Sequence, residues 1–203
     1  MDAIIAQGFE AGGHVKSTVA LSTIVPTVVE VVKPVSVIAA GGVANGRGLV
    51  AALSLGAQAV SMGTRFLASE ETRVVHAYKE RAVQSTAEDT VYTLLFDLGW
   101  PDAAHRVLRN KVIEEWEAAG CPPTGRRPGE GSIIGTMPVA GTTVEMVKYS
   151  VFPPLTGFSG DIADAVLYAG ESCGLVHNVK PAAQIVQDVV REAEEVIEEI
   201  QRR

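Results

Sequence analysis

The sequence predicts an α/β protein in which parallel strands alternate with helices, followed by a region that is mostly helical. Three short apolar runs, at residues 3–6, 35–40 and 57–62, support the first part. Each run lacks polar alternation, as is typical of strands that are buried on both faces of a parallel sheet. Each run is also followed by glycine, which is typical of the strand-to-helix turns of this class.

Helical patterns fill the intervals between these runs. Residues 23–32 are predicted to form a helix that stops before Pro34, because the residue before a proline disfavours the helical conformation. Residues 45–56 have one apolar face and end at Gly56, a residue typical of helix C-termini. The order of strands and helices predicts right-handed βαβ units. A further helix is expected at about 70–85.

After residue 86 the pattern changes to one that predicts mostly helices and loops. A helix is expected over 101–119, with Pro101 in its first turn, and a loop rich in Gly, Pro and Arg over 120–136. A short helix is expected within 159–170. The chain is therefore predicted to be mostly helical in its second region.

A last helix is expected from Pro181 almost to the end of the chain, because its apolar residues repeat at a spacing of three to four. Its opposite, acidic face is interpreted as a solvated surface. We expect this helix to pack back on the first unit. The predicted units are 1–86, 87–175 and 176–203.

Composition restricts the classes of protein to which the chain can belong. It has 203 residues, 47% of them hydrophobic, so a globular fold is expected. A net charge of −7 argues against nucleic-acid binding, although backbone N–H groups can still hold an anionic ligand. No apolar run is long enough to span a membrane and no signal peptide is recognisable. With two cysteines at no metal-binding spacing, we expect a cytoplasmic protein with reduced thiols and no metal.

The strand ends carry the motifs "QGFEAGGH", "AAGGVANG" and "SMGTRF". Because the carboxyl ends of parallel strands lie on one face of a sheet or barrel, these motifs are expected to be neighbours. Gly41-Gly42 and Gly63-Thr64 would let the backbone approach a ligand, and the helix after each pair would point free N–H groups at the same spot. Tight turns alone would explain one such pair, whereas two pairs favour a phosphate site.

Gln7 and His14 are the side chains that we expect to act in the first motif. Gln7 occupies the last strand position, where its amide can reach the polar edge of a ligand, and Gly12 and Gly13 leave space beside it. His14 is then expected at the mouth of the site. A lone histidine is most often structural, and it is this position that favours a functional role.

Other polar residues are weaker candidates. His76, His105 and His177 lack such a context and are predicted to be surface or packing residues. Arg65 is expected either to help hold the phosphate or to form a structural ion pair. The Met62 side chain is expected in the core, with ligand contact only through its backbone.

Four stretches together resemble the nitronate monooxygenases, formerly called 2-nitropropane dioxygenases: "DAIIAQGFEAGGH", "PVSVIAAGGVANGRGLVAALSLGAQAVSMGTRFLAS", "RVLRN" and "LYAGESCGLVHNVKPAAQIV". FMN-dependent enoyl-acyl-carrier-protein reductases share this pattern. The resemblance implies that the chain is the C-terminal portion of a TIM-type (β/α)8 barrel, with three βα units and a mostly helical second region. It also implies FMN at the carboxyl ends of the strands.

The resemblance assigns roles to single residues. His14 would be the catalytic histidine near the flavin N5, orienting a nitronate or acting as a base toward a neutral nitroalkane. The implied reaction oxidises an alkyl nitronate with O2 to a carbonyl compound and nitrite, with redox chemistry supplied by FMN. The implied cofactor-binding residues are Gln7, Gly12, Gly13, Gly41, Gly42, Ser61, Met62, Gly63 and Thr64.

The chain departs from the family pattern in two ways. Val15 and Lys16 follow His14 where family members often have a glycine, so we expect specificity to differ there. The first five strands of the barrel are absent, and three strands cannot close a barrel. We therefore expect open edges, an exposed apolar face and low stability or association. The missing part would be a separate N-terminal half, a second copy or, as Met1 at a strand start favours, upstream sequence of the same gene.

Three hypotheses follow for the function. The first is an FMN-dependent nitronate monooxygenase. The second is an FMN-dependent enoyl-acyl-carrier-protein reductase, which NAD(P)H oxidation with an enoyl thioester would reveal. The third is an inactive partial chain that binds FMN, phosphate or a partner polypeptide. The absence of half of the barrel is the reason for this hypothesis.

Overall fold

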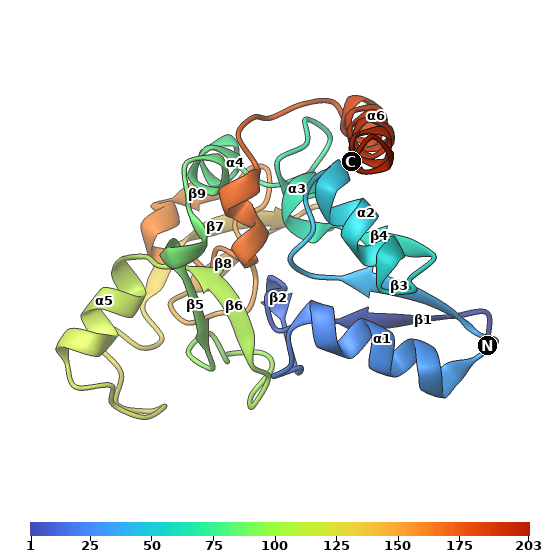
Figure 1. The fold of residues 1–203 in the computed structure, drawn as a ribbon. Coiled ribbons are helices and arrows are strands. Elements are labelled where there is room, and N and C mark those ends of the chain that lie inside the picture. The colour runs from blue at the N-terminus through green and yellow to red at the C-terminus, as the bar shows by residue number, and fades with distance from the viewer.

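In the computed structural model, which describes residues 1–203, three strands form a parallel sheet (Figure 1). β1 (Ala3–Gln7) pairs with β3 (Ser36–Ala40), and β3 pairs with β4 (Ala59–Ser61). Gln7 pairs with Ala40, which in turn pairs with the last residue of β4, so the three carboxyl ends are level. The three predicted strands and their parallel order are confirmed.

Two helices pack on this sheet and complete its core. α1 (Leu21–Val32) ends before Pro34, as predicted, and α2 (Gly46–Ser54) follows β3. The Leu21 N–H donates to both carboxylate oxygens of Glu10, at 3.0 and 3.1 Å. This carboxylate stabilises the helix because it lies at the positive end of the helix dipole. The buried residues of the core are Ala6, Leu21, Val25, Val37, Ala39, Val43, Ala52 and Ala57.

The third predicted helix is shorter than expected. α3 (Gly63–Leu67) begins directly after β4, and α4 (His76–Val83) begins several residues later than the pattern predicts. Between them, Ser69 bridges to Lys180 and Val74 bridges to Leu155. These pairings with distant segments replace the first turns of the expected helix.

The prediction that the second region is mostly helical is wrong. β5 (Thr90–Thr93), β6 (His105–Leu108) and β2 (Gly13–His14) form one antiparallel sheet. A second antiparallel sheet consists of β7 (Ile133–Val139), β8 (Thr142–Val147) and β9 (Ser159–Gly160). The helical parts are α5 (Lys111–Ala118) and three short 3-10 turns, η1 (Ala87–Asp89), η2 (Ile162–Asp164) and η3 (Glu171–Leu175).

The helix expected over 101–119 begins only at Lys111. Asp102 has a positive φ of 57°, and all four residues of β6 are buried in the sheet, so a helix cannot start at Pro101. Asn110 instead caps α5, its side-chain oxygen accepting from the Ile113 N–H at 3.2 Å. Within 159–170, β9 and the short turn η2 replace the expected helix.

The last helix, α6 (Ala182–Gln201), lies beside α2 (Figure 1). A Cβ on Gly46 would lie 2.3 Å from the Ala193 backbone N, so the two helices cross at close range because this residue is glycine. β2 belongs to the predicted unit 1–86 but pairs with β6, so the first two predicted units share a sheet. None of the helices combines the length and the apolar character needed to cross a membrane.

Candidate functional site

A cavity of about 360 Å³ lies at the carboxyl ends of the parallel strands. The last residues of all three strands, Gln7, Ala40 and Ser61, line it. Most of the predicted site residues meet there, as the parallel topology requires. Those that line the cavity are Gln7, Gly12, Gly13, Gly41, Ser61, Gly63 and Thr64.

Three predicted site residues do not line this cavity. Met62 packs its side chain against the core of the parallel sheet, in agreement with the expectation that it is a core residue. Gly42 adopts a left-handed φ of 70° and lies beside Glu10. His14 lies at the rim, since its neighbour Gly13 and the adjacent Tyr168 both line the cavity.

Some glycines of the site are required by the fold, and another leaves space for a ligand. A Cβ on Gly12 would lie 2.2 Å from the Gly170 N, and Gly41 has a φ of 96° with Ala11 N within 2.9 Å of its virtual Cβ. Both are therefore required by the fold. Gly63 has neither a positive φ nor any atom within 4 Å of its virtual Cβ. The space beside Gly63 is free for a ligand.

The N-terminus of α2 is not free to bind a phosphate, contrary to the expectation. The Gly46 N–H donates to Glu192 Oε2 at 2.9 Å, and the Gly48 N–H donates to Asn45 Oδ1 at 3.0 Å. A carboxylate therefore already occupies the positive end of this helix. Gly63 and Thr64, in the first turn of α3, line the cavity instead.

The His14 ring is partly buried among aromatic rings. It stacks on Trp100 with centroids 4.2 Å apart, and the rings of His105 and Tyr168 each lie 5.6 Å away. Its Nε2 atom is buried and has no hydrogen-bond partner in the chain. Burial lowers the pKa of His14 below 6.5, so the neutral ring is favoured at neutral pH.

His105 is a packing residue, as predicted, but a fully buried one whose two ring nitrogens both have partners. Nδ1 lies 2.8 Å from the Ala103 carbonyl oxygen, and Nε2 accepts from the Phe96 N–H at 3.3 Å. This pattern fits the neutral ring that carries its proton on Nδ1. The other two candidates, His76 and His177, are exposed.

The structure places Arg65 away from the strand-end cavity. Its Nη2 donates to the Asn178 carbonyl oxygen at 2.7 Å and to the Ala68 carbonyl oxygen at 3.4 Å, and its side chain is buried. It lines a separate, smaller cavity together with Ala44 and Asn45 before α2, residues of the segment 175–180 and residues of α6. Arg65 therefore connects chain segments, and no contact places it on the predicted phosphate.

The sequence profile of the family described as nitronate monooxygenase matches residues 1–192. This chain belongs to the nitronate monooxygenase family. It is 32% identical over 216 residues to a nitronate monooxygenase of Metarhizium robertsii, in an alignment that covers 97% of this chain and 53% of that protein.

Solved structures agree with this assignment to the nitronate monooxygenase family. A nitroalkane oxidase from Streptomyces ansochromogenes has a TM-score of 0.68 and 26% identity, covering 98% of this chain and 53% of that one. FabK from Thermotoga maritima has a TM-score of 0.69 and 31% identity, covering 98% of this chain and 57% of that one. The chain spans about half the length of these relatives.

Nitronate monooxygenases are flavin-dependent oxidoreductases, and the residues of the cavity fit such a group. The open position at Gly63 and the unpartnered His14 Nε2 leave room and hydrogen-bonding capacity for a ligand. Leu67 and Val74 supply apolar surface, and Gln7 and Ser61 supply polar groups. A mixed lining of this kind is typical of cofactor sites.

Sequence reasoning missed the residues that close the cavity from the second region, above all Tyr168 and Ser172. The Tyr168 hydroxyl donates to the Val151 carbonyl oxygen at 2.9 Å, and burial raises the pKa of Tyr168 to about 12. The Gly170 N–H donates to Thr64 Oγ1 at 2.9 Å, which fastens this segment to α3. In the sequence, Tyr168 lies at the end of the helix expected within 159–170, and Ser172 lies beyond Gly170, the glycine that signals a turn between these two polar side chains.

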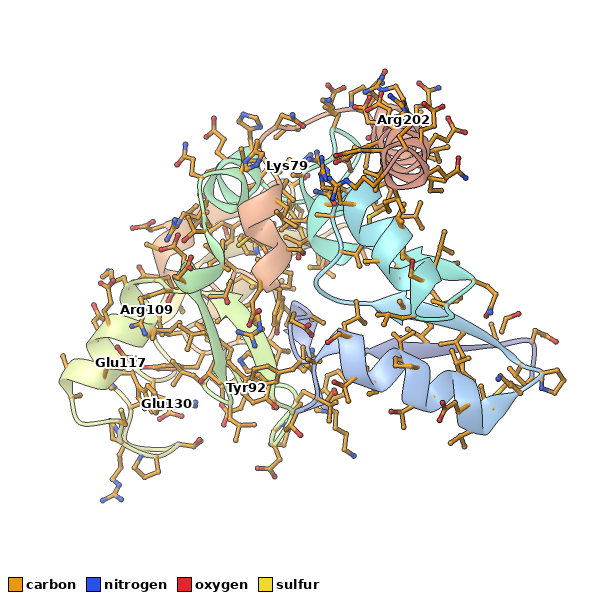
Figure 2. All side chains as sticks on the ribbon, in the orientation of Figure 1. Lys79, Tyr92, Arg109, Glu117, Glu130 and Arg202 are labelled. Atoms are coloured by element: carbon orange, nitrogen blue, oxygen red, sulfur yellow. The ribbon has the colours of Figure 1, made fainter.

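The residue after His14 is not at the mouth of the site, contrary to the expectation for specificity. Val15 is fully buried, and its N–H donates to the Ala104 carbonyl oxygen at 2.8 Å. Tyr92, labelled in Figure 2, donates its hydroxyl to the Val15 carbonyl oxygen at 3.2 Å. Only Lys16 of this pair is exposed.

Proposed function

We propose that this chain provides the cofactor-binding and catalytic part of an FMN-dependent nitronate monooxygenase. One observation carries the proposal: the buried, unpartnered Nε2 of His14 lies at the rim of a cavity where Gly63 leaves open space. Buried polar atoms in proteins normally have hydrogen-bond partners, and the exceptions are often functional. A bound ligand would satisfy this nitrogen.

His14 has the chemistry that this reaction needs. Bound FMN supplies the redox chemistry for converting an alkyl nitronate and O2 into a carbonyl compound and nitrite. Because burial lowers the pKa of His14, its neutral ring can orient a nitronate through Nε2 or accept the proton of a neutral nitroalkane. A protonated ring would lose the second ability.

The contacts favour a phosphate position beside β4 over one at α2. Gly41, Gly63 and Thr64 line the cavity, whereas Glu192 occupies the N-terminus of α2. We therefore propose that the FMN phosphate lies against the first turn of α3. Gln7 retains its amide oxygen for the cofactor, because its Nε2 already donates to the His14 carbonyl oxygen at 3.1 Å.

The test is flavin binding and nitrite release by the purified chain, alone and together with the N-terminal half of a family member. We expect FMN to bind in either preparation, and nitrite to form from an alkyl nitronate with His14 present but not in His14→Asn. Absence of both flavin binding and nitrite in every preparation would contradict the proposal. Flavin binding without turnover in every preparation would identify a binding-only chain.

FabK supports a second candidate, an FMN-dependent enoyl-acyl-carrier-protein reductase, because its structure is as similar to this chain as that of the nitroalkane oxidase. The two activities differ in their electron source. Oxidation of NAD(P)H that depends on an enoyl thioester, with no nitrite from nitronates, would select the reductase.

We also propose that the three βα units are the C-terminal portion of a (β/α)8 barrel. β1 and β4 are both edges of the parallel sheet, and Ile5 on β1 is 61% exposed. Unpaired edges and apolar surface favour contact with further strands. The partner that we propose is additional polypeptide with the missing strands, or else a second copy of this chain.

The remaining partners and the location are proposals as well. A nitronate and O2 are the proposed substrates, and a net charge of −7 makes nucleic acid an unfavourable partner. The structure has two free thiols, at Cys121 and Cys173, which supports a location in the reducing cytoplasm.

A further inference from the structure

The loop between β5 and β6 places the indole of Trp100 against His14, the candidate catalytic histidine. Thr93 at the end of β5 pairs with His105 at the start of β6, so residues 94–104 form a closed loop beside β2. In this loop Trp100 stacks on the His14 ring, with centroids 4.2 Å apart and planes inclined by 29°. Trp100 is nevertheless 56% exposed, so one side of the indole faces away from the protein.

Backbone contacts fix the loop in this position. The Leu98 N–H donates to the Tyr149 carbonyl oxygen, and the Val151 N–H donates back to the Leu98 carbonyl oxygen, each at 3.1 Å. Gly99 and Asp102, on either side of Trp100, both have a positive φ, which is uncommon for aspartate. These backbone contacts and turns keep Trp100 in one position.

Three rings from different elements together define the plane of the imidazole. Trp100 covers one of its faces, while His105 on β6 approaches edge-on and Tyr168, before η3, is tilted at 42°. The backbone of His14 is held separately, by the pairing of β2 with β6 and by Gln7, which donates to the His14 carbonyl oxygen. No hydrogen bond at Nε2 orients the ring, so the surrounding rings do, and among them the indole is the one stacked on its face.

We propose that Trp100 is the positioning residue of His14 and holds the plane of its imidazole ring. The proposal rests on the proposed function in so far as His14 acts on the substrate. The indole is an apolar aromatic surface that excludes water from the face of the imidazole ring that it covers.

The consequence for His14 can be measured on the chain itself, without flavin or turnover. The titratable groups that face its ring are His105 and Tyr168; His105 is neutral in the pattern described above and the pKa of Tyr168 is about 12. Burial lowers the pKa of His105 as well, and the nearby His14 lowers it further when its ring is charged. Removal of the indole leaves both of these rings in place, so the titration of His14 would change because water reaches its ring.

The experiment follows the imidazole signals of the full chain by NMR across pH, with His14→Asn used to assign the His14 signal. In Trp100→Ala we expect the midpoint of His14 to rise toward about 6.5, the value for a solvated ring. Trp100→Phe, which keeps a flat ring, should retain the low midpoint. Trp116→Phe, at the other tryptophan of the chain, is the control and should leave it unchanged.

A His14 midpoint that is the same in Trp100→Ala and in the wild type would overturn the proposal. In an active preparation, Trp100→Ala should also lower kcat/KM by about tenfold, as the loss of one aromatic stack allows, with recovery in Trp100→Phe. If the midpoint shifts but no preparation releases nitrite, the positioning role stands and the proposed function fails. The two outcomes are therefore distinguishable.

Discussion

Two neighbouring histidines, His14 and His105, differ in how their ring nitrogens are satisfied. Both ring nitrogens of His105 have backbone partners, whereas Nε2 of His14 is buried without one. A buried group with all its partners contributes to folding, and a buried group without one is available for a ligand. At the residue scale, this contrast separates the structural histidine from the candidate catalytic one.

The free energy of unfolding of the chain should decrease as the pH is lowered, because of these two histidines. Burial lowers the pKa of His105 and of His14 below the usual 6.5, so the unfolded chain binds more protons than the folded chain once the pH drops below 6.5. The free energy of unfolding therefore keeps the contribution of these neutral rings above this pH and loses it progressively below. Urea unfolding at a series of pH values from 8 to 5 measures this slope.

His105→Asn should flatten that slope, because it removes a group that must stay neutral to accept the Phe96 N–H. His177→Asn is the matched control at an exposed position. Equal slopes in the two variants would show that burial of His105 does not drive the pH dependence.

Gly12 and Gly63 should respond differently to the same substitution. Gly12→Ala places a methyl group 2.2 Å from the Gly170 N and should destabilise the fold by about 1–3 kcal/mol. Gly63→Ala meets no atom within 4 Å and should change stability by less than about 0.5 kcal/mol, while weakening FMN binding. Chemical unfolding and flavin titration of both variants make the comparison. Unaltered flavin affinity in Gly63→Ala would remove this position from the proposed cofactor site.

At the scale of elements, the sequence was informative where contacts are local. The strands over 3–6, 35–40 and 57–62 are continuous apolar runs joined by short crossovers, and they pair in chain order. The short strand at 105–108 is buried because it lies between β5 and β2, some 90 residues earlier, and because Val107 and Leu108 pack into core clusters with distant residues. No periodicity in a single segment contains that information. The predicted helix over 101–119 failed for this reason.

The candidate site, too, could be predicted from the sequence only where it depends on local contacts. The strand-end glycines identified the cavity, because parallel strands bring their carboxyl ends together. Trp100 and Tyr168 reach His14 from two other segments, and their contribution depends on antiparallel pairing that the sequence did not predict. The free N–H groups expected at the start of α2 depend on distant sequence in the same way, because the Gly46 N–H donates to Glu192 of α6.

That contact between helices is itself testable. Glu192→Ala removes the acceptor of the Gly46 N–H and a negative charge at the N-terminus of α2, and should destabilise the chain by about 0.5–2 kcal/mol. Glu194→Ala, an exposed carboxylate on the same helix, should stay within about 0.5 kcal/mol of the wild type. Urea unfolding compares them. Equal stability of the two variants would mean that α6 is held by its apolar face alone.

At the scale of the whole molecule, the open sheet should govern the behaviour of the isolated chain. β1 and β4 are edges, and Ile5 on β1 is 61% exposed, so the chain presents backbone and apolar surface that can pair with other strands. We expect the purified chain to associate at micromolar concentration and to bind an apolar dye.

A charge on the exposed edge should reverse this association, because a buried carboxylate opposes strand pairing and apolar contact. Ile5→Glu should shift the sedimentation coefficient toward that of a monomer and reduce dye binding. Val31→Glu, at an exposed apolar position on the helix α1 and not on an edge strand, should do neither. Addition of an N-terminal family half should suppress dye binding of the wild type but not of Ile5→Glu. A wild-type chain that sediments as a monomer and binds no dye would instead show that the sheet is stable as an open structure.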